Sequence, residues 1–172
     1  RLGIDRDLRS PYTSVDVDRR NVHFTQLETM AYVNAQRAAR GIDPLFWNED
    51  LSQLNRWHAR RVYEIKGFAH VNPNTGRGPS DRAVWAGYPA DRRCTVYSEV
   101  VTTGGYSPGV TDIERNAALI VEAWMRSDGH REQILHERYD VGGVGVFVGE
   151  NGTRVAVMTM CDRRYLSEGE LN

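Results

Sequence analysis

The sequence of 172 residues is poor in features that would narrow its class at once. It has two cysteines and one lysine, and no stretch of about 20 apolar residues, the length that a membrane-spanning helix needs. The charges balance, with 22 Lys and Arg against 23 Asp and Glu, for a formal net charge of -1. We therefore expect no transmembrane segment. We also expect no nucleic-acid partner, because such binding takes a strongly basic face.

Compact catalytic motifs are missing as well. The sequence contains no Gly-rich phosphate loop, no His-Glu-x-x-His motif and no Cys-x-x-Cys pair. Its two cysteines, Cys94 and Cys161, lie far apart and lack the spacing of a zinc knuckle. Their even number permits one disulfide bond, and two buried free thiols are the alternative.

What remains is typical of one globular domain. Hydrophobic residues make up 40% of the chain and charged residues 26%, and the length suffices for one real core. Residues 1–21 are polar and show no sustained period, which predicts an N-terminal arm or linker, followed by a domain over 22–166 and a tail over 167–172. Because the chain begins at Arg1, without an initiator methionine or an apolar signal segment, we expect a processed or trimmed fragment.

Capping signals and helical periodicity predict two helices in the first half. Thr25 and Glu28 form a Ser/Thr-x-x-Glu capping box, and Gly41 is placed to end that helix. Asn48 is the predicted N-cap of the second helix, which Gly67 ends. The apolar face of the first helix is predicted to comprise Leu27, Met30, Ala31, Asn34 and Ala38.

The second half interleaves strands with helices. The pattern predicts a strand over 96–103, a helix opened by the capping box of Thr111 and Glu114, a short helix capped by Ser127 or Asp128, and a hairpin whose turn is 150–152. This order predicts an α/β fold, an α-β-α sandwich in which helices cover both faces of a central, mainly antiparallel sheet.

The candidate functional residues are histidines and one glutamate. His70 and His130 both stand at the ends of predicted elements, where side chains often meet at functional sites. Neutral imidazole is a common metal ligand and general base, so the two could share a site. Glu99 lies in an otherwise uncharged β-forming run, where it either faces solvent or holds a partner. His58 is interpreted as a core histidine, and His23 and His136 as surface residues.

Several segments together resemble the CAP or SCP-like family of cysteine-rich secretory, antigen 5 and pathogenesis-related proteins, in its short bacterial form. Residues 33–37 and 41–45 are similar to the family's first helix and its Gly-x-x-Pro-Leu turn. Residues 68–70, Phe-Ala-His, resemble its first signature histidine. Residues 123–131 resemble the bacterial Trp-Met-x-Ser-x-Gly-His-Arg motif, and residues 141–146 resemble the strand that follows.

The resemblance implies an α-β-α sandwich, secretion, and a central site that holds two histidines and two acids. It assigns His70 and His130 as ligands of a weakly bound zinc or another divalent cation. Glu99 falls where the family reads Gly-Glu-Asn, although Ser98 and Val100 replace the flanking residues here. The second acid has no clear counterpart, since the matching place carries Ser127 and then Asp128, which could simply be a cap.

Three functional hypotheses follow. The first is a secreted, non-enzymatic binding domain in which His70 and His130 hold a metal ion or small ligand and Glu99 orients one histidine. The second is a metal-assisted hydrolase with Glu99 as general base. The third is a module for a sterol, another lipid or an extracellular partner, with a groove near Trp57, Trp85 or Trp124. We expect a monomer, and a binding role more than catalysis.

Overall fold

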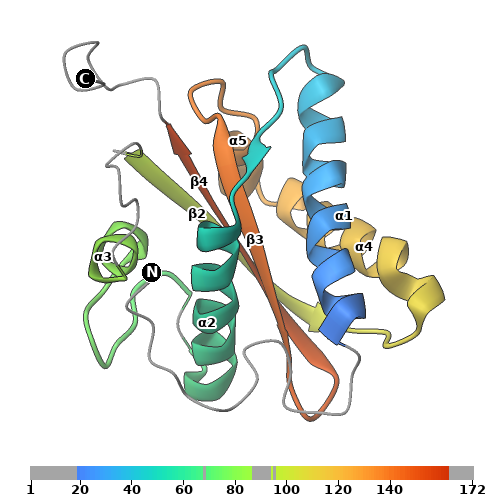
Figure 1. Cartoon of the computed structure of the whole chain (residues 1–172), viewed down its shortest axis with the longest axis vertical. Coiled ribbons are helices and arrows are strands. Elements are labelled where there is room, and N and C mark those ends of the chain that lie inside the picture. The colour runs from blue at the N-terminus through green and yellow to red at the C-terminus, as the bar shows by residue number, and fades with distance from the viewer. Residues whose placement is uncertain (1–18, 68, 87–93, 95, 163–172) are drawn as a thin grey trace.

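Four strands form one mixed sheet in the order β1-β3-β4-β2. The structure is a computed structural model that describes residues 19–67, 69–86, 94 and 96–162 (Figure 1). The strands are β1 (Phe46–Trp47), β2 (Val96–Gly105), β3 (Val141–Val148) and β4 (Thr153–Asp162). The long strands pair antiparallel, and β1 pairs parallel with β3. The predicted hairpin is confirmed, with Gly152 in its turn at a φ of 74°.

Helices cover both faces of this sheet, so the predicted α-β-α sandwich is confirmed. They are α1 (Arg19–Ala38), α2 (Glu49–Ile65), α3 (Pro79–Trp85), α4 (Ile113–Arg126) and α5 (Asp128–Ile134), with a 3-10 turn, η1 (Val110–Asp112), before α4. One apolar core joins α1, α4 and α5 to one face, and two smaller cores join α2 and α3 to the other. In Figure 1, α2 and α3 stand apart from the neighbouring pair α1 and α4. No described helix has the length and apolarity to cross a bilayer.

The first helix differs from its prediction. It begins at Arg19, so Thr25 lies within α1 and donates a hydrogen bond to the Asn21 carbonyl oxygen at 2.8 Å instead of capping the helix. The predicted face is correct at Met30, which is buried, but wrong at Leu27, which is 37% exposed, whereas Gln26 is fully buried. Gln26 Oε1 accepts a hydrogen bond from the Val146 amide at 2.9 Å, which satisfies the oxygen of this buried side chain.

Of the other predicted helix caps, two are confirmed and one is wrong. The Asn48 side chain accepts from the Leu51 amide at 3.0 Å, as predicted, and Ser127 caps α5 by accepting from the His130 amide. The capping box at Thr111 is wrong, because Thr111 lies in η1 and α4 begins only at Ile113. Arg19–Asn21 of the predicted arm form the first turn of α1, whereas residues 1–18 and the predicted tail lie outside the described part of the chain.

Two long-range links hold the ends of these elements together. Cys94 and Cys161 form a disulfide, which settles the alternative that the sequence left open and joins the segment before β2 to β4. Arg37, fully buried on α1, donates hydrogen bonds to the carbonyl oxygens of Asp43, Ile134, His136 and Tyr139 at 2.7 to 3.1 Å. One guanidinium thus satisfies four carbonyls of the connections around β1, α5 and β3.

Two glycines of β3 let α2 lie directly on the sheet. A Cβ atom added at Gly143 would lie 2.5 Å from the Ser52 amide nitrogen, and one at Gly145 would lie 2.2 Å from the Arg56 amide nitrogen. The close approach allows Asn55 Nδ2 to donate to the Gly143 carbonyl oxygen at 2.7 Å. Because these contacts are to helix backbone, no side-chain rotation could make room for a methyl group.

We therefore predict that Gly145→Ala destabilises the fold by about 3 kcal/mol or more, since the new methyl forces α2 away from β3. Urea unfolding, followed by circular dichroism, measures the free energy of unfolding. Gly105→Ala is the matched control, because nothing lies within 4 Å of its added Cβ atom. It should shift stability by about 0.5 kcal/mol at most, and equal losses in the two variants would contradict the proposed close approach.

Candidate functional site

The site is built around Glu99, a buried carboxylate on β2. Its side chain is 1% exposed, so the alternative of an outward-facing strand residue is wrong. Its register partner in β4 is Thr159, whose hydroxyl donates to Asn55 of α2 at 2.8 Å. Glu99 therefore lies on the face of the sheet that α2 and α3 cover. A buried carboxylate needs compensating donors. Arg82 and His70 supply them, and His58 lies close to the carboxylate as a third neighbour.

Arg82 of α3 is the first of these partners and was not foreseen from the sequence. Its Nη2 donates to Glu99 Oε2 in an ion pair, and its Nη1 donates to the His70 carbonyl oxygen at 2.5 Å. The Arg82 side chain is 15% exposed, so this pair is largely shielded from water. No local motif marks Arg82, because an arginine on a short helix usually lies in solvent.

His70 is the second partner, and it connects Glu99 to the surface. Its Nδ1 lies 3.0 Å from Glu99 Oε1, and its side chain is 46% exposed. Since an ionised carboxylate only accepts hydrogen bonds, Nδ1 carries the proton. In the neutral ring the lone pair then resides on Nε2, so the structure brings the predicted residues His70 and Glu99 together in an arrangement that orients the imidazole.

His58 of α2 is the third neighbour of Glu99 and is buried, as the sequence indicated. Its Nε2 donates to the Ala69 carbonyl oxygen at 2.6 Å and lies 3.6 Å from Glu99 Oε1. Burial lowers the pKa of His58 from 6.5 to about 4; the charge of Glu99 opposes this effect, and that of Arg82 reinforces it. His58 is therefore neutral near pH 7 and fixes the loop that carries His70.

His130 lies at the start of α5, half-buried, with its amide held by the Ser127 side chain at 3.5 Å. Burial lowers the pKa of His130, and the charge of His70 lowers it further. The two imidazoles are therefore close enough to interact electrostatically. Ser98, next to Glu99, donates to Gln133 Oε1 of α5 at 2.7 Å, which ties the helix of His130 to β2.

Other candidates lie outside this group. The Asp128 side chain is 92% exposed and pairs with Arg131 at 2.7 Å, so it does not supply the second acid. Trp124 is fully buried in the core between α4 and the sheet. Within the described residues, no three His, Cys, Asp or Glu side chains are grouped closely enough to hold a metal ion. Any metal here would have to rely on fewer protein ligands.

Comparison with known proteins agrees with this architecture. A protein of Bacillus subtilis strain 168, described as uncharacterized protein YkwD, is 28% identical over 125 residues, which is 73% of this chain. The match spans 43% of the Bacillus protein, so the chain covers less than half the length of this curated relative.

Two solved structures share the fold at low sequence identity. An extracellular protein containing an SCP domain from Bacillus anthracis superposes with a TM-score of 0.64 and 16% identity, over 81% of this chain and 41% of that one. An outer surface protein from Borrelia burgdorferi superposes with a TM-score of 0.62 and 17% identity, over 78% of this chain and 89% of that one.

The fold and the site together define a class: an α-β-α sandwich whose buried glutamate supports a surface histidine. The model of the cysteine-rich secretory protein family, CAP, matches residues 30–162, and the chain belongs to that family. The resemblance predicted from the motifs around His70 and His130 is thereby confirmed.

The lowered pKa of His58 predicts a loss of stability in acid. Below pH 6.5 the unfolded chain takes up a proton at this residue, whereas the folded protein does so only near pH 4. The free energy of unfolding should therefore fall between these values, by about 3 kcal/mol at most, and change little from this group below pH 4. Chemical denaturation at a series of pH values measures the curve.

The control for this prediction is His58→Gln, which keeps a side-chain donor for the Ala69 carbonyl but cannot titrate. This variant should be less stable at pH 7 and show a flatter curve between pH 6.5 and pH 4. His136→Gln, at an exposed position, should retain the wild-type slope. An unchanged acid slope in His58→Gln would show that other groups carry the effect.

Proposed function

We propose that this chain is an extracellular binding domain that holds a divalent cation weakly through His70 and His130, without catalysing a reaction. The observation that carries the proposal is the contact of His70 Nδ1 with the buried carboxylate of Glu99 at 3.0 Å. A histidine that donates from one ring nitrogen to a carboxylate presents the other nitrogen as a more basic ligand in a fixed orientation.

The chemistry of the available donors favours a borderline transition metal such as zinc. His70 Nε2 and an imidazole nitrogen of His130 are nitrogen ligands, which suit zinc better than calcium or magnesium. The burial that lowers the pKa of His130 favours the deprotonated ring that a metal requires. With two protein ligands, water or a group from a partner would complete the coordination, so weak affinity is expected.

The surroundings of Glu99 favour a positioning role over that of a general base. Its Oε2 is paired with Arg82, its Oε1 accepts from His70, and its side chain is 1% exposed. A general base must reach the proton that it removes, directly or through one water. A carboxylate with both oxygens occupied and no exposed edge orients its neighbours instead, so the hydrolase hypothesis has less support than binding.

The comparisons support an extracellular location. The Bacillus anthracis protein is described as extracellular and the Borrelia protein as an outer surface protein. The disulfide between Cys94 and Cys161 is consistent with an oxidising compartment.

Isothermal titration with zinc chloride tests the metal site. We predict that the wild-type chain binds about one ion, that His70→Ala and His130→Ala each abolish the saturable heat, and that Glu99→Gln weakens binding about tenfold because His70 loses its charged acceptor. His136→Ala, an exposed histidine of α5's C-terminal flank, serves as the matched control and should bind like the wild type.

Thermal unfolding of each variant, recorded without metal, separates loss of ligands from loss of fold. Identical binding heats for the wild type and for the variant that lacks both His70 and His130 would refute the proposed site. A loss of binding in His136→Ala equal to that in His70→Ala would point to nonspecific histidine binding, which is also contrary to the proposal.

A further inference from the structure

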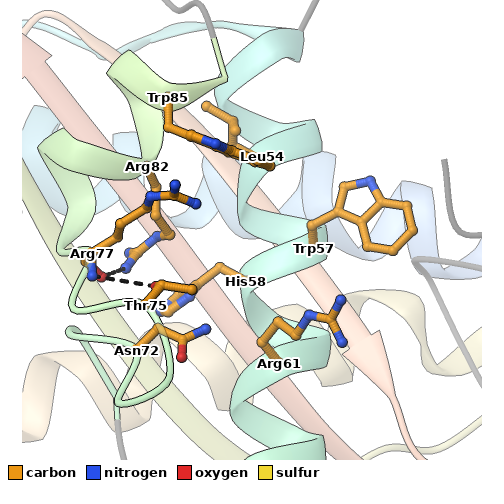
Figure 2. Close-up of a pocket in the computed structure, with 9 residues that line it drawn as sticks. All are labelled: Leu54, Trp57, His58, Arg61, Asn72, Thr75, Arg77, Arg82 and Trp85. Atoms are coloured by element: carbon orange, nitrogen blue, oxygen red, sulfur yellow. Dashed lines mark hydrogen bonds between the residues drawn. The ribbon is translucent and has the colours of Figure 1, made fainter. Parts of the chain in front are cut away.

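A separate pocket of about 290 Å³ lies between α2, α3 and the loop that joins them (Figure 2). Leu54 and Trp57 of α2 and Trp85 of α3 supply apolar and aromatic walls. Large side chains of this kind are usually buried, yet Trp85 is 49% exposed. Two of the three tryptophans that the sequence associated with a groove, Trp57 and Trp85, thus line the same pocket.

The pocket is also positively charged. Arg61, Arg77 and Arg82 line it, and among the described residues no acidic side chain does. The charges of two of these arginines are compensated, because Arg82 pairs with Glu99 and Arg61 Nη1 lies 2.9 Å from Glu64. Arg77 has no carboxylate partner anywhere in the described part of the chain. An uncompensated guanidinium beside apolar walls favours a ligand that carries a negative charge.

Arg77 is held in place before any ligand arrives. Its guanidinium carbon lies 4.4 Å from the centroid of the Trp85 ring, a cation–π contact. Its carbonyl oxygen accepts from the Asn72 amide at 3.1 Å and from Arg82 Nη1 at 3.2 Å, which closes the loop. Preorganised groups lose less conformational entropy on binding, so this loop is suited to recognition.

The same loop offers two neutral donors to the pocket. Asn72 Oδ1 already accepts from the Asn74 amide at 2.9 Å, which leaves the Nδ2 group of Asn72 to donate. Thr75 Oγ1 accepts from the Arg77 amide at 3.3 Å, and its hydroxyl proton remains to be donated. In Figure 2 both side chains lie with His58 at the end of the pocket opposite Trp85.

We propose that this pocket binds a small organic anion that has a flat ring, with an aromatic carboxylate as the ligand class. The ring would pack against Trp57 and Trp85, and the carboxylate would accept from Arg77 and from Asn72 or Thr75. The volume is at the lower end of the range for small-molecule sites and suits a ligand of one or two rings. The pocket does not include His70 or His130, so the inference is independent of the metal site.

Isothermal titration with 2-naphthoate, compared with the neutral analogue 2-naphthalenemethanol, tests the proposal. The wild-type chain should bind one naphthoate, at least about fivefold more tightly than the alcohol, because only the anion pairs with the guanidinium. Arg77→Gln should weaken naphthoate binding about tenfold and leave the alcohol unaffected within about twofold. Trp85→Leu should weaken both, since it removes the ring contact.

Arg126→Gln is the matched control, because Arg126 lies on α4, across the sheet, with its side chain 75% exposed. It should bind both probes like the wild type, and so should His130→Ala, which separates this site from the metal site. The proposal is overturned if naphthoate shows no saturable binding up to about 5 mM, if the alcohol binds equally well, or if Arg126→Gln weakens binding as much as Arg77→Gln. Thermal melts of the variants exclude loss of fold as the cause.

Discussion

The direct contact of α2 with the backbone of β3 is the constraint on which the rest of the molecule depends. Gly143 and Gly145 allow an approach that any larger residue would prevent. Asn55 then bonds across the interface to Gly143 and to Thr159, the register partner of Glu99. Since His58 lies one helical turn further along α2, the same contact sets the distance between this histidine and the carboxylate. The contacts that pack α2 on β3 therefore also set the geometry of the site around Glu99.

The burial of Glu99 affects both the exposed His70 and the pocket between α2 and α3. A carboxylate removed from water must be compensated, and Arg82 and His70 do this together. Arg82 and His58 also line the aromatic pocket between α2 and α3. One network of charges thus supports a surface histidine on one side and forms part of a pocket on the other. A fold of this kind does not by itself dictate a single function.

Signals that act within a few residues were enough to predict much of this chain. The side chain of Asn48 caps α2, Ser127 caps α5, and the Asn151-Gly152 turn closes the hairpin. Each of these depends on hydrogen bonds or backbone preferences between near neighbours. The motifs around His70 and His130 identified the family, and through it the layered fold. The local capping signal at Thr25 predicted the wrong start of the first helix. The helix begins at Arg19, so Thr25 lies within it.

The sequence by itself determined the family, the order of the elements, and His70, Glu99 and His130 as the residues to examine. Only the tertiary structure decided that Glu99 is buried, that Arg82 is its ion-pair partner, and that Arg37 donates to three carbonyls in residues 134–139. It also decided that Cys94 and Cys161 are bonded. The physical reason is the separation of these residues along the chain. They contact one another only in the folded protein, and no local period or motif relates them. Whether a buried polar group finds a partner depends on how the layers pack, and no single segment encodes that.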